Sequence, residues 1–189
     1  MHALQSLLLL GLPVAIVGSP ALLPRAPTGP FTLYAYGEGI GGVPLFTSGS
    51  RAFVGNSSLS GDSEAAPVQF NTGTDDALLG SPNTTSTSSD PSWSNLTFMV
   101  PDTTSSTHNV GFTNSTPGSG MSATGFTFYG HVLLHQNDDG TLKSLFYAVP
   151  SDTEGIWSLD WNSTDDDTEG KVLLTVKATA PSKGMDETQ

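Results

Sequence analysis

Short apolar or alternating runs, each followed by a cluster of Gly, Pro, Ser, Thr, Asn or Asp, recur through most of this chain. Such runs are typical of β-strands, and the 3.6-residue period of amphipathic helices is nearly absent. In one run, Leu96, Phe98 and Val100 alternate with Asn95 and Thr97. Because Asn95 begins an N-x-S/T sequon, we expect its face in solvent and the Leu96 face in the core.

The mature chain is therefore predicted to be all-β, with little or no helix. About ten short strands favour a single antiparallel β-sandwich or barrel, formed by one domain over residues 26–180. The expected strands are Phe31–Tyr36, Val43–Phe46, Arg51–Val54, Pro67–Asn71, Asn95–Val100, Asn109–Thr113, Gly125–Gln136, Leu142–Val149, Gly155–Trp161 and Lys171–Ala178. Strand order, and the choice between sandwich and barrel, stay open at this point.

Two hairpins are predicted near the end of the domain. Residues 125–136 and 142–149 flank Asn137-Asp138-Asp139-Gly140, whose Asp-Gly pair suits a tight turn. Residues 155–161 and 171–178 flank a longer acidic loop that begins at Asn162.

The stretch "FTLYAYGEGIGG" contains the spacing G-x-G-x-x-G at Gly37, Gly39 and Gly42. A dinucleotide site requires a helix directly after these glycines, because the helix N-terminus holds the pyrophosphate. Here Val43-Pro44-Leu45-Phe46 follows, which opposes a helix. We therefore interpret the glycines as a connection between two strands, and no cofactor is expected.

Residues 1–21 are expected to be a secretory signal peptide. Leu7–Val17 is almost entirely apolar, which matches the length of a signal h-region and is too short to cross a bilayer. Small residues at Ser19 and Ala21 suit cleavage after Ala21. A short pro-segment ending at Arg25 and a flexible tail over residues 181–189 complete the expected organisation.

Glycosylation signals agree with secretion. The five N-x-S/T sequons are at Asn56, Asn83, Asn95, Asn114 and Asn162. No later stretch is long and apolar enough for a transmembrane helix. We expect a soluble glycoprotein located outside the cell or in the cell wall.

The formal net charge of −12 limits the choice of partner. Nucleic acid and anionic membranes require a cationic surface, so both are poor candidates. The sequence leaves the oligomeric state open.

Catalytic and metal-binding signals are weak. Paired carboxylates are the signature of glycoside hydrolysis, and Glu38 and Glu154 are the two glutamates that adjoin aromatic strands. Both are next to glycine in expected turns. His131 and His135 are four residues apart, which on a strand is too far for easy joint ligation, so we expect surface histidines and no metal.

Aromatic side chains are the main candidates for ligand binding. Trp157 and Trp161 share one face of an expected strand, where burial is favoured over an exposed platform for sugar rings. Trp93, beside a polar loop, and Tyr34 and Tyr36 are better candidates for exposed aromatic side chains.

Two stretches, "PFTLYAYGEGIGGVPLFTSGSRAFVG" and "FYAVPSDTEGIWSLDWNSTDDDTE", resemble small secreted proteins of filamentous ascomycete fungi. The resemblance covers most of the mature chain. It implies a secreted or cell-wall-associated protein with no assigned activity, and it transfers no catalytic residues.

The sequence thus predicts a non-enzymatic secreted glycoprotein of the fungal cell wall or surface, which binds a wall polysaccharide or a host component. Two alternatives remain: a β-sandwich carbohydrate-active enzyme that uses Glu38 and Glu154, and a secreted effector or elicitor.

Overall fold

The computed structural model describes residues 27–85, 90–137, 139–164 and 167–182. Strands make up 47% of the chain and short 3-10 turns 4%, so the expected all-β class is confirmed. The strands are β1 (Phe31–Thr32), β2 (Tyr34–Gly37), β3 (Ile40–Thr47), β4 (Ala52–Gly55), β5 (Ala66–Thr72), β6 (Leu78–Pro82), β7 (Leu96–Pro101), β8 (Gly111–Thr113), β9 (Met121–Ser122), β10 (Phe126–Tyr129), β11 (Val132–Gln136), β12 (Leu142–Lys143), β13 (Phe146–Pro150), β14 (Ile156–Trp161), β15 (Val172–Leu173) and β16 (Thr175–Lys177). The 3-10 turns are η1 (Ser57–Leu59) and η2 (Thr74–Asp76).

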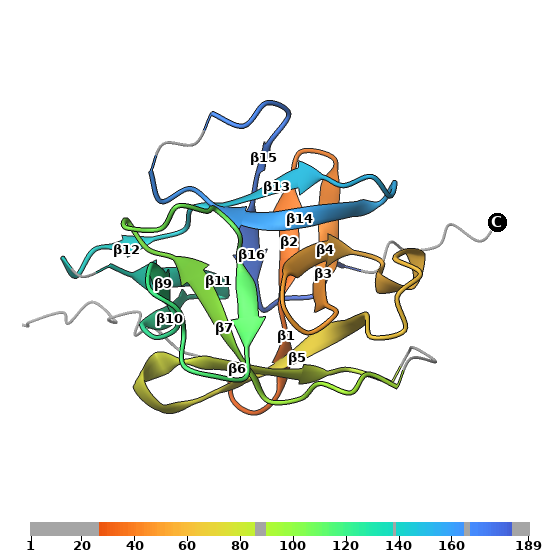
Figure 1. Cartoon of the computed structure of the whole chain (residues 1–189), viewed down its shortest axis with the longest axis horizontal. Coiled ribbons are helices and arrows are strands. Elements are labelled where there is room, and N and C mark those ends of the chain that lie inside the picture. Colours follow the sequence, from red (N-terminus) through yellow and green to blue (C-terminus); the bar gives the residue numbers. More distant parts are fainter. Residues whose placement is uncertain (1–26, 86–89, 138, 165–166, 183–189) are drawn as a thin grey trace, which may run out of the picture.

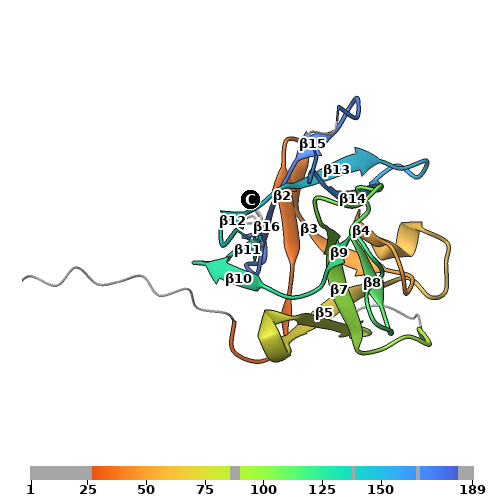
Figure 2. The same cartoon turned by 60° about the vertical axis from the view of Figure 1, so that its left-hand side comes forward.

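All strand pairs are antiparallel, and they form one branched sheet. The main path runs β10-β11-β16-β2-β3-β4-β14-β13-β15. From β3 a branch leads through β5 and β6 to β7, which also pairs with β8 and β9. In Figure 1, β13 and β14 cross the upper part of the view, and β5 and β6 cross the lower part. The sheet does not close on itself, which is consistent with a sandwich (Figure 2).

The core lies inside the folded sheet, between its main path and the β5–β6–β7 branch, and is rich in phenylalanine. Phe70 stacks on Phe112 at 6.1 Å between ring centroids and meets Phe98 edge to face at 5.7 Å. Phe98, Leu96 and Val100 are all buried, and Asn95 is exposed, as the alternation predicts. Each fully buried side chain of this size contributes about 1.5–3 kcal/mol, so the packed aromatic cluster stabilises the sandwich without disulfides.

The glycine-rich stretch forms a tight hairpin between β2 and β3. Glu38 and Gly39 make the turn, and Gly39 has a φ of 70°. The register then shifts by a β-bulge, where Gly42 has a φ of 86°. A Cβ atom on Gly42 would lie 2.7 Å from Cε1 of Tyr36. A strand rather than a helix follows, so the interpretation as a connection between strands is confirmed.

The pairing of the C-terminal strands differs from the expectation. The expected strand over 125–136 is a hairpin, because Gly130 (φ 60°) and His131 form a turn between β10 and β11. Of the first expected hairpin, only the short β11–β12 pair forms. The second is wrong: β14 pairs with β13 and β4, and β16 pairs with β2 and β11. The five residues 151–155 join β13 to β14, and this short loop closes at a lower entropic cost than the long acidic one.

Within the described ranges, no helix has the length and hydrophobicity needed to cross a membrane. The expected signal peptide, the pro-segment and residues 183–189 of the expected tail lie outside the described residues. Pro181 and Ser182 are described and are exposed.

Candidate functional site

Trp93 is buried, which corrects the expectation that it is exposed. Its side chain is only 8% exposed, and its indole Nε1–H donates to the Glu64 carbonyl oxygen at 2.7 Å. The Glu64 carboxylate also accepts hydrogen bonds from the backbone N–H and the hydroxyl of Ser92, both at 2.8 Å. These three bonds hold the polar loop against the core. The polar residues around Trp93 in the sequence therefore give no sign that its side chain is buried.

The two tryptophans of β14 do not form an exposed platform. Trp161 is 2% exposed and meets Phe146 edge to face at 4.7 Å between ring centroids. Trp157 is half-buried and packs against the same core. The predicted burial is confirmed most clearly for Trp161.

Tyr34 and Tyr36 are half-exposed on one side of β2. The Tyr36 hydroxyl donates to the Thr179 carbonyl oxygen at 2.7 Å, and Nζ of Lys177 lies 5.0 Å from the centroid of its ring. The sequence-based expectation of exposed aromatic side chains thus holds only in part for these two tyrosines, whereas Tyr129 on the same sheet is 61% exposed.

Glu38 and Glu154 are both exposed, and the fold does not bring them together. Glu38 lies at the tip of the β2–β3 hairpin and Glu154 in the β13–β14 turn. The two turns lie apart in Figure 2. The structure therefore does not single out these two carboxyl groups as an acid–base pair.

The five sequons all lie at the ends of strands or in loops. Asn56, Asn95 and Asn114 are exposed, whereas Asn83 and Asn162 are half-buried. Asn56 also caps η1, since its side-chain oxygen accepts from the Ser58 N–H at 3.1 Å. All five positions reach the surface, and their glycosylation stays a prediction.

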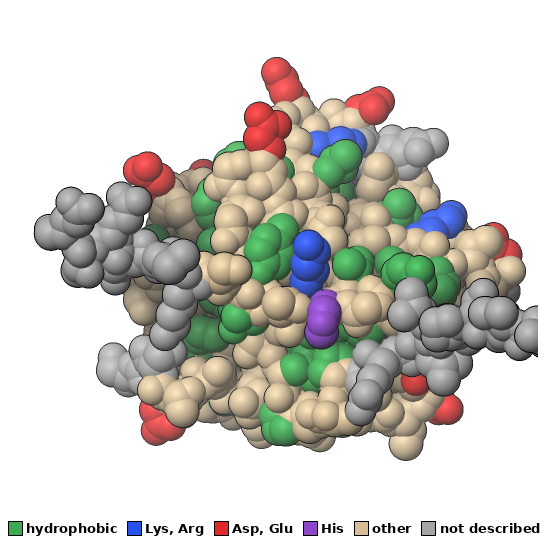
Figure 3. Space-filling model, turned by 180° about the vertical axis from the view of Figure 1, so that it is seen from behind, with side chains coloured by type: hydrophobic (Ala, Val, Ile, Leu, Met, Phe, Trp, Pro, Cys, Tyr) green, Lys and Arg blue, Asp and Glu red, His purple; other side chains and the backbone are tan. Residues whose placement is uncertain are grey.

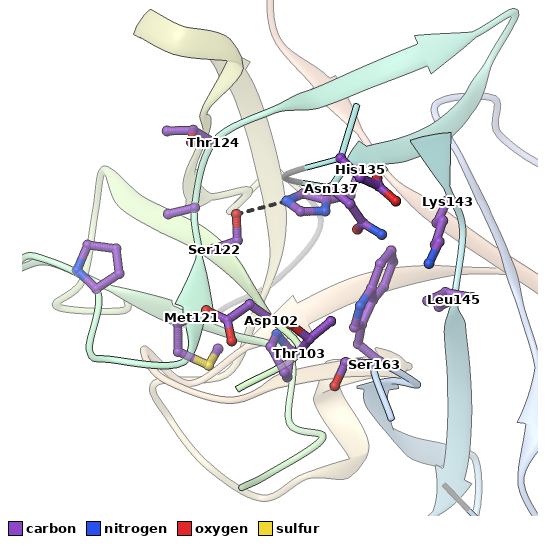
Figure 4. Close-up of a pocket in the computed structure, with 15 residues that line it drawn as sticks. Asp102, Thr103, Met121, Ser122, Thr124, His135, Asn137, Lys143, Leu145 and Ser163 are labelled. Atoms are coloured by element: carbon purple, nitrogen blue, oxygen red, sulfur yellow. Dashed lines mark hydrogen bonds between the residues drawn. The ribbon is translucent and has the colours of Figure 1, made fainter. Parts of the chain in front are cut away.

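One cavity is a groove of about 580 Å³ between β9, β11, β12 and the end of β14. Four segments of the chain build it, within residues 101–103, 117–124, 135–145 and 161–163, and its wall carries both apolar and polar side chains. We call it the β9 groove; it is lined by Pro101, Asp102, Thr103, Pro117, Met121, Ser122, Ala123, Thr124, His135, Asn137, Asp139, Lys143, Leu145, Trp161 and Ser163. Figure 4 shows Ser122 and His135 together on one side and Lys143 with Leu145 on the other.

A hydrogen-bonded pair lies at the wall of the β9 groove. Ser122 Oγ and His135 Nε2 are 2.8 Å apart (Figure 4). The His135 ring is 5% exposed and packs edge to face on Phe126 and Trp161, with centroids at 5.2 and 5.8 Å. The expectation of a surface histidine is thus wrong for His135, because its strand register places it opposite Phe126 on the core side. His131, in the turn, is exposed as expected.

The rim of the β9 groove carries charges of both signs. Hydrogen bonds from the side chain and the backbone N–H of Thr141, together with the nearby Lys143 ammonium, hold the pKa of the Asp139 carboxyl below its ordinary value of 3.8. Asp102 accepts from the N–H and the hydroxyl of Thr104 at 2.6 and 2.7 Å. These carboxylates are oriented by their own loops, and in the described part of the chain no three His, Asp or Glu residues converge to hold a metal ion.

The β9 groove can hold a polar molecule of moderate size. Its volume lies within the range typical of ligand sites, and its wall combines apolar surface with convergent hydroxyl and amide groups. Sequence reasoning missed Ser122, Asn137 and Lys143, because no local motif connects segments that only the tertiary fold brings together. A scan against family models and searches of curated proteins and of solved structures found no match to this chain.

Proposed function

We propose that the protein is a secreted glycoprotein of a fungal wall or surface, and that the β9 groove binds a hydroxyl-rich ligand of the saccharide class. The expected signal peptide, the five sequons and the resemblance to small secreted fungal proteins support the location. The composition of the β9 groove supports the ligand class.

The observation that carries the proposal is the combination of apolar surface and hydroxyl-directed polar groups in one groove. Saccharides present C–H faces, which pack on apolar and aromatic side chains, and hydroxyl groups, which require hydrogen-bond partners. Met121 and Leu145, both partly exposed, supply the first kind of surface. Ser122 and Asn137 supply the second.

The hydroxyl groups of Ser122 and Ser163 differ in their hydrogen bonds, and each difference favours contact with a ligand. The bond to His135 fixes the position of Ser122 Oγ. Ser163 Oγ is buried and has no hydrogen-bond partner among the residues that the structure describes, although its residue lines the groove. An unsatisfied buried hydroxyl costs about 1–3 kcal/mol, so a ligand hydroxyl that reaches Ser163 would recover part of this free energy.

The experiment is calorimetric titration of the glycosylated secreted protein with soluble oligomers of chitin, β-glucan and cellulose. We expect one of these neutral series to bind, and Ser122→Ala and Asn137→Ala each to weaken binding by roughly 2–10-fold, the equivalent of one hydrogen bond. Asn71→Ala, at an exposed position of β5 outside the groove, is the control. If no series binds, or if the groove variants bind as the control does, the proposal fails.

A second candidate function is ester hydrolysis, favoured by the 2.8 Å contact between Ser122 Oγ and His135 Nε2. Ser122 Oγ would attack the ester carbonyl while His135 Nε2 accepts its proton and returns it to the leaving alkoxide. Water would then hydrolyse the acyl-serine and restore the hydroxyl. A fluorophosphonate probe that labels the wild type but not Ser122→Ala would support this function. Absence of both labelling and turnover of p-nitrophenyl acetate would exclude it.

A further inference from the structure

The outer surface of strands β10, β11, β16, β2 and β3 carries a continuous row of side chains. Paired positions in adjacent strands place their side chains on the same face of a sheet. The registers Tyr129↔Val132, Val132↔Lys177, Lys177↔Tyr34 and Tyr34↔Pro44 connect across all five strands. We call this set the tyrosine row; its members are Tyr129, Val132, Lys177, Tyr34 and Pro44.

The tyrosine row lies on the side of the sheet that faces away from the core. The neighbours along each strand, among them Phe128, Leu133, Ala35 and Val176, are buried. By contrast, Tyr129 is 61% exposed, and the other members of the row are half-exposed. Tyr36 lies two residues beyond Tyr34 on the same face of β2. The result is a surface with Tyr129 on the outer strand β10 and with Tyr34 and Tyr36 on β2, two strands further in than β11.

A lysine and a histidine meet at the centre of this surface, although the protein is strongly acidic. Lys177 and His131 line a shallow depression together with Tyr36, and none of its described lining residues is acidic. Figure 3 shows one basic and one histidine side chain side by side, surrounded by hydrophobic groups, with acidic side chains only towards the margin. In the described part of the chain, the one salt bridge joins Arg51 to Asp160, so Lys177 has no carboxylate partner.

The side chains of the depression are held in place by the fold. The Tyr36 hydroxyl is anchored to the Thr179 carbonyl, and Nζ of Lys177 lies over the Tyr36 ring at 5.0 Å. A cation held over an aromatic ring loses less conformational freedom when it binds an anion. Lys177 is therefore positioned to receive a negative group that approaches along the surface.

We propose that the tyrosine row, with Tyr36 and His131, binds an acidic polysaccharide of the uronic-acid type. Tyr34 and Tyr129 would pack against separate sugar rings of one chain, and Lys177, held over Tyr36, would bind a carboxylate together with His131. With strands about 4.8 Å apart, five strands present a surface roughly 19 Å wide. This width suits several units of an extended chain rather than a single sugar.

The charge of the surface favours this ligand over other polyanions. Nucleic acid carries one charge per about 1.7 Å of duplex and binds through many cations, whereas this depression offers one lysine and one histidine on a chain of net charge −12. A polyuronate has one carboxylate per sugar ring, and the rings between the charges suit the tyrosines. This second site does not depend on the function proposed for the β9 groove.

The test compares binding of the full secreted protein to polygalacturonate and to its methyl ester, which has the same backbone without the charges. We expect the acid form to bind at least tenfold more tightly, and Lys177→Gln to remove roughly 10–100-fold of that affinity, as for loss of a charged hydrogen bond. Tyr34→Ala should weaken binding of both forms. Circular dichroism checks that each variant is folded.

Lys171→Gln is the matched control, because Lys171 also lies over a tyrosine, Tyr147, at 5.5 Å, and the change in charge is the same. We expect this variant to bind as the wild type does. Equal binding of the acid and the ester, or an equal loss in the two lysine variants, would overturn the proposal. Titration with the neutral oligomers reports on the β9 groove separately, so failure of one site is distinguishable from failure of the other.

Discussion

The adjacent glycines Gly41 and Gly42 provide a direct test of the hairpin that supports the tyrosine row. Gly42 has a φ of 86°, and a Cβ atom there would lie 2.7 Å from Tyr36 Cε1 and 2.9 Å from Pro181 Cβ. A Cβ atom on Gly41 would meet nothing within 4 Å, and its φ is not in the positive range. Gly42→Ala should therefore destabilise the fold, and Gly41→Ala should not.

The expected cost of Gly42→Ala has two parts. A left-handed conformation costs an L-residue about 1–2 kcal/mol. Displacing the Tyr36 ring would break its hydrogen bond to Thr179 and its contact with Lys177. These two interactions together contribute about 1–2 kcal/mol to the free energy of unfolding. The sum is about 2–4 kcal/mol, which corresponds to a decrease in Tm of roughly 5–15 °C for a domain of this size. Gly41→Ala should lie between neutral and about 1 kcal/mol stabilising, because alanine has less backbone freedom in the unfolded chain.

Urea denaturation followed by tryptophan fluorescence measures both variants against the wild type. The reasoning is refuted if the two free energies of unfolding agree within about 0.5 kcal/mol. It is also refuted if Gly42→Ala is destabilising but retains full binding to polygalacturonate, because the clash is located on the ring that holds Lys177.

Three further predictions concern the core and the loops. Trp161→Ala should lower the free energy of unfolding by about 3–5 kcal/mol, and Trp157→Ala by clearly less, since Trp157 is only half-buried; equal losses in thermal denaturation would contradict this ranking. Thr141→Val should raise the pKa of Asp139 towards 3.8 and leave the lowered pKa of Asp62 unchanged in a carbon-13 NMR titration. Because the folded pKa of Asp139 is lowered, its contribution to stability is present above pH 3.8 and is lost as the pH falls through the folded pKa. Glu64→Ala should remove both hydrogen bonds to Ser92 and make the loop there sensitive to limited proteolysis, although Trp93 keeps its bond to the backbone carbonyl of residue 64; Glu154→Ala, in an exposed turn, should not change the digestion pattern.

Local patterning predicted the strands well, because alternation depends only on neighbouring residues. Two strands were missed for physical reasons. In β6, Leu78–Pro82, the centre is Gly80, which is required because a Cβ there would lie 2.7 Å from Val68 Cγ1. In β9, Met121–Ser122, only two residues pair with β7, which is too short to give a period.

The pairing of strands and the candidate sites could not be predicted in the same way. The β9 groove joins Asp102, Ser122, His135 and Trp161, and no sequence spacing encodes their meeting. Trp93 shows the same limit, since its partner Glu64 is 29 residues away. The alternation along β2 predicted that Tyr34 and Tyr36 point away from the core, but their neighbours Lys177 and Tyr129 come from strands more than 90 residues later.

The position of β16 between β2 and β11 has a consequence for biosynthesis. A chain that emerges from the ribosome can form β2 and β11 long before residues 175–177 exist, and until then both strands present unpaired edges. Such edges invite association between nascent chains. Arrival of β16 covers both edges and at the same moment places Lys177 between Tyr34 and Val132. Completion of the sheet and assembly of the tyrosine row are thus a single event, so a molecule that misfolds late in synthesis would lack this row.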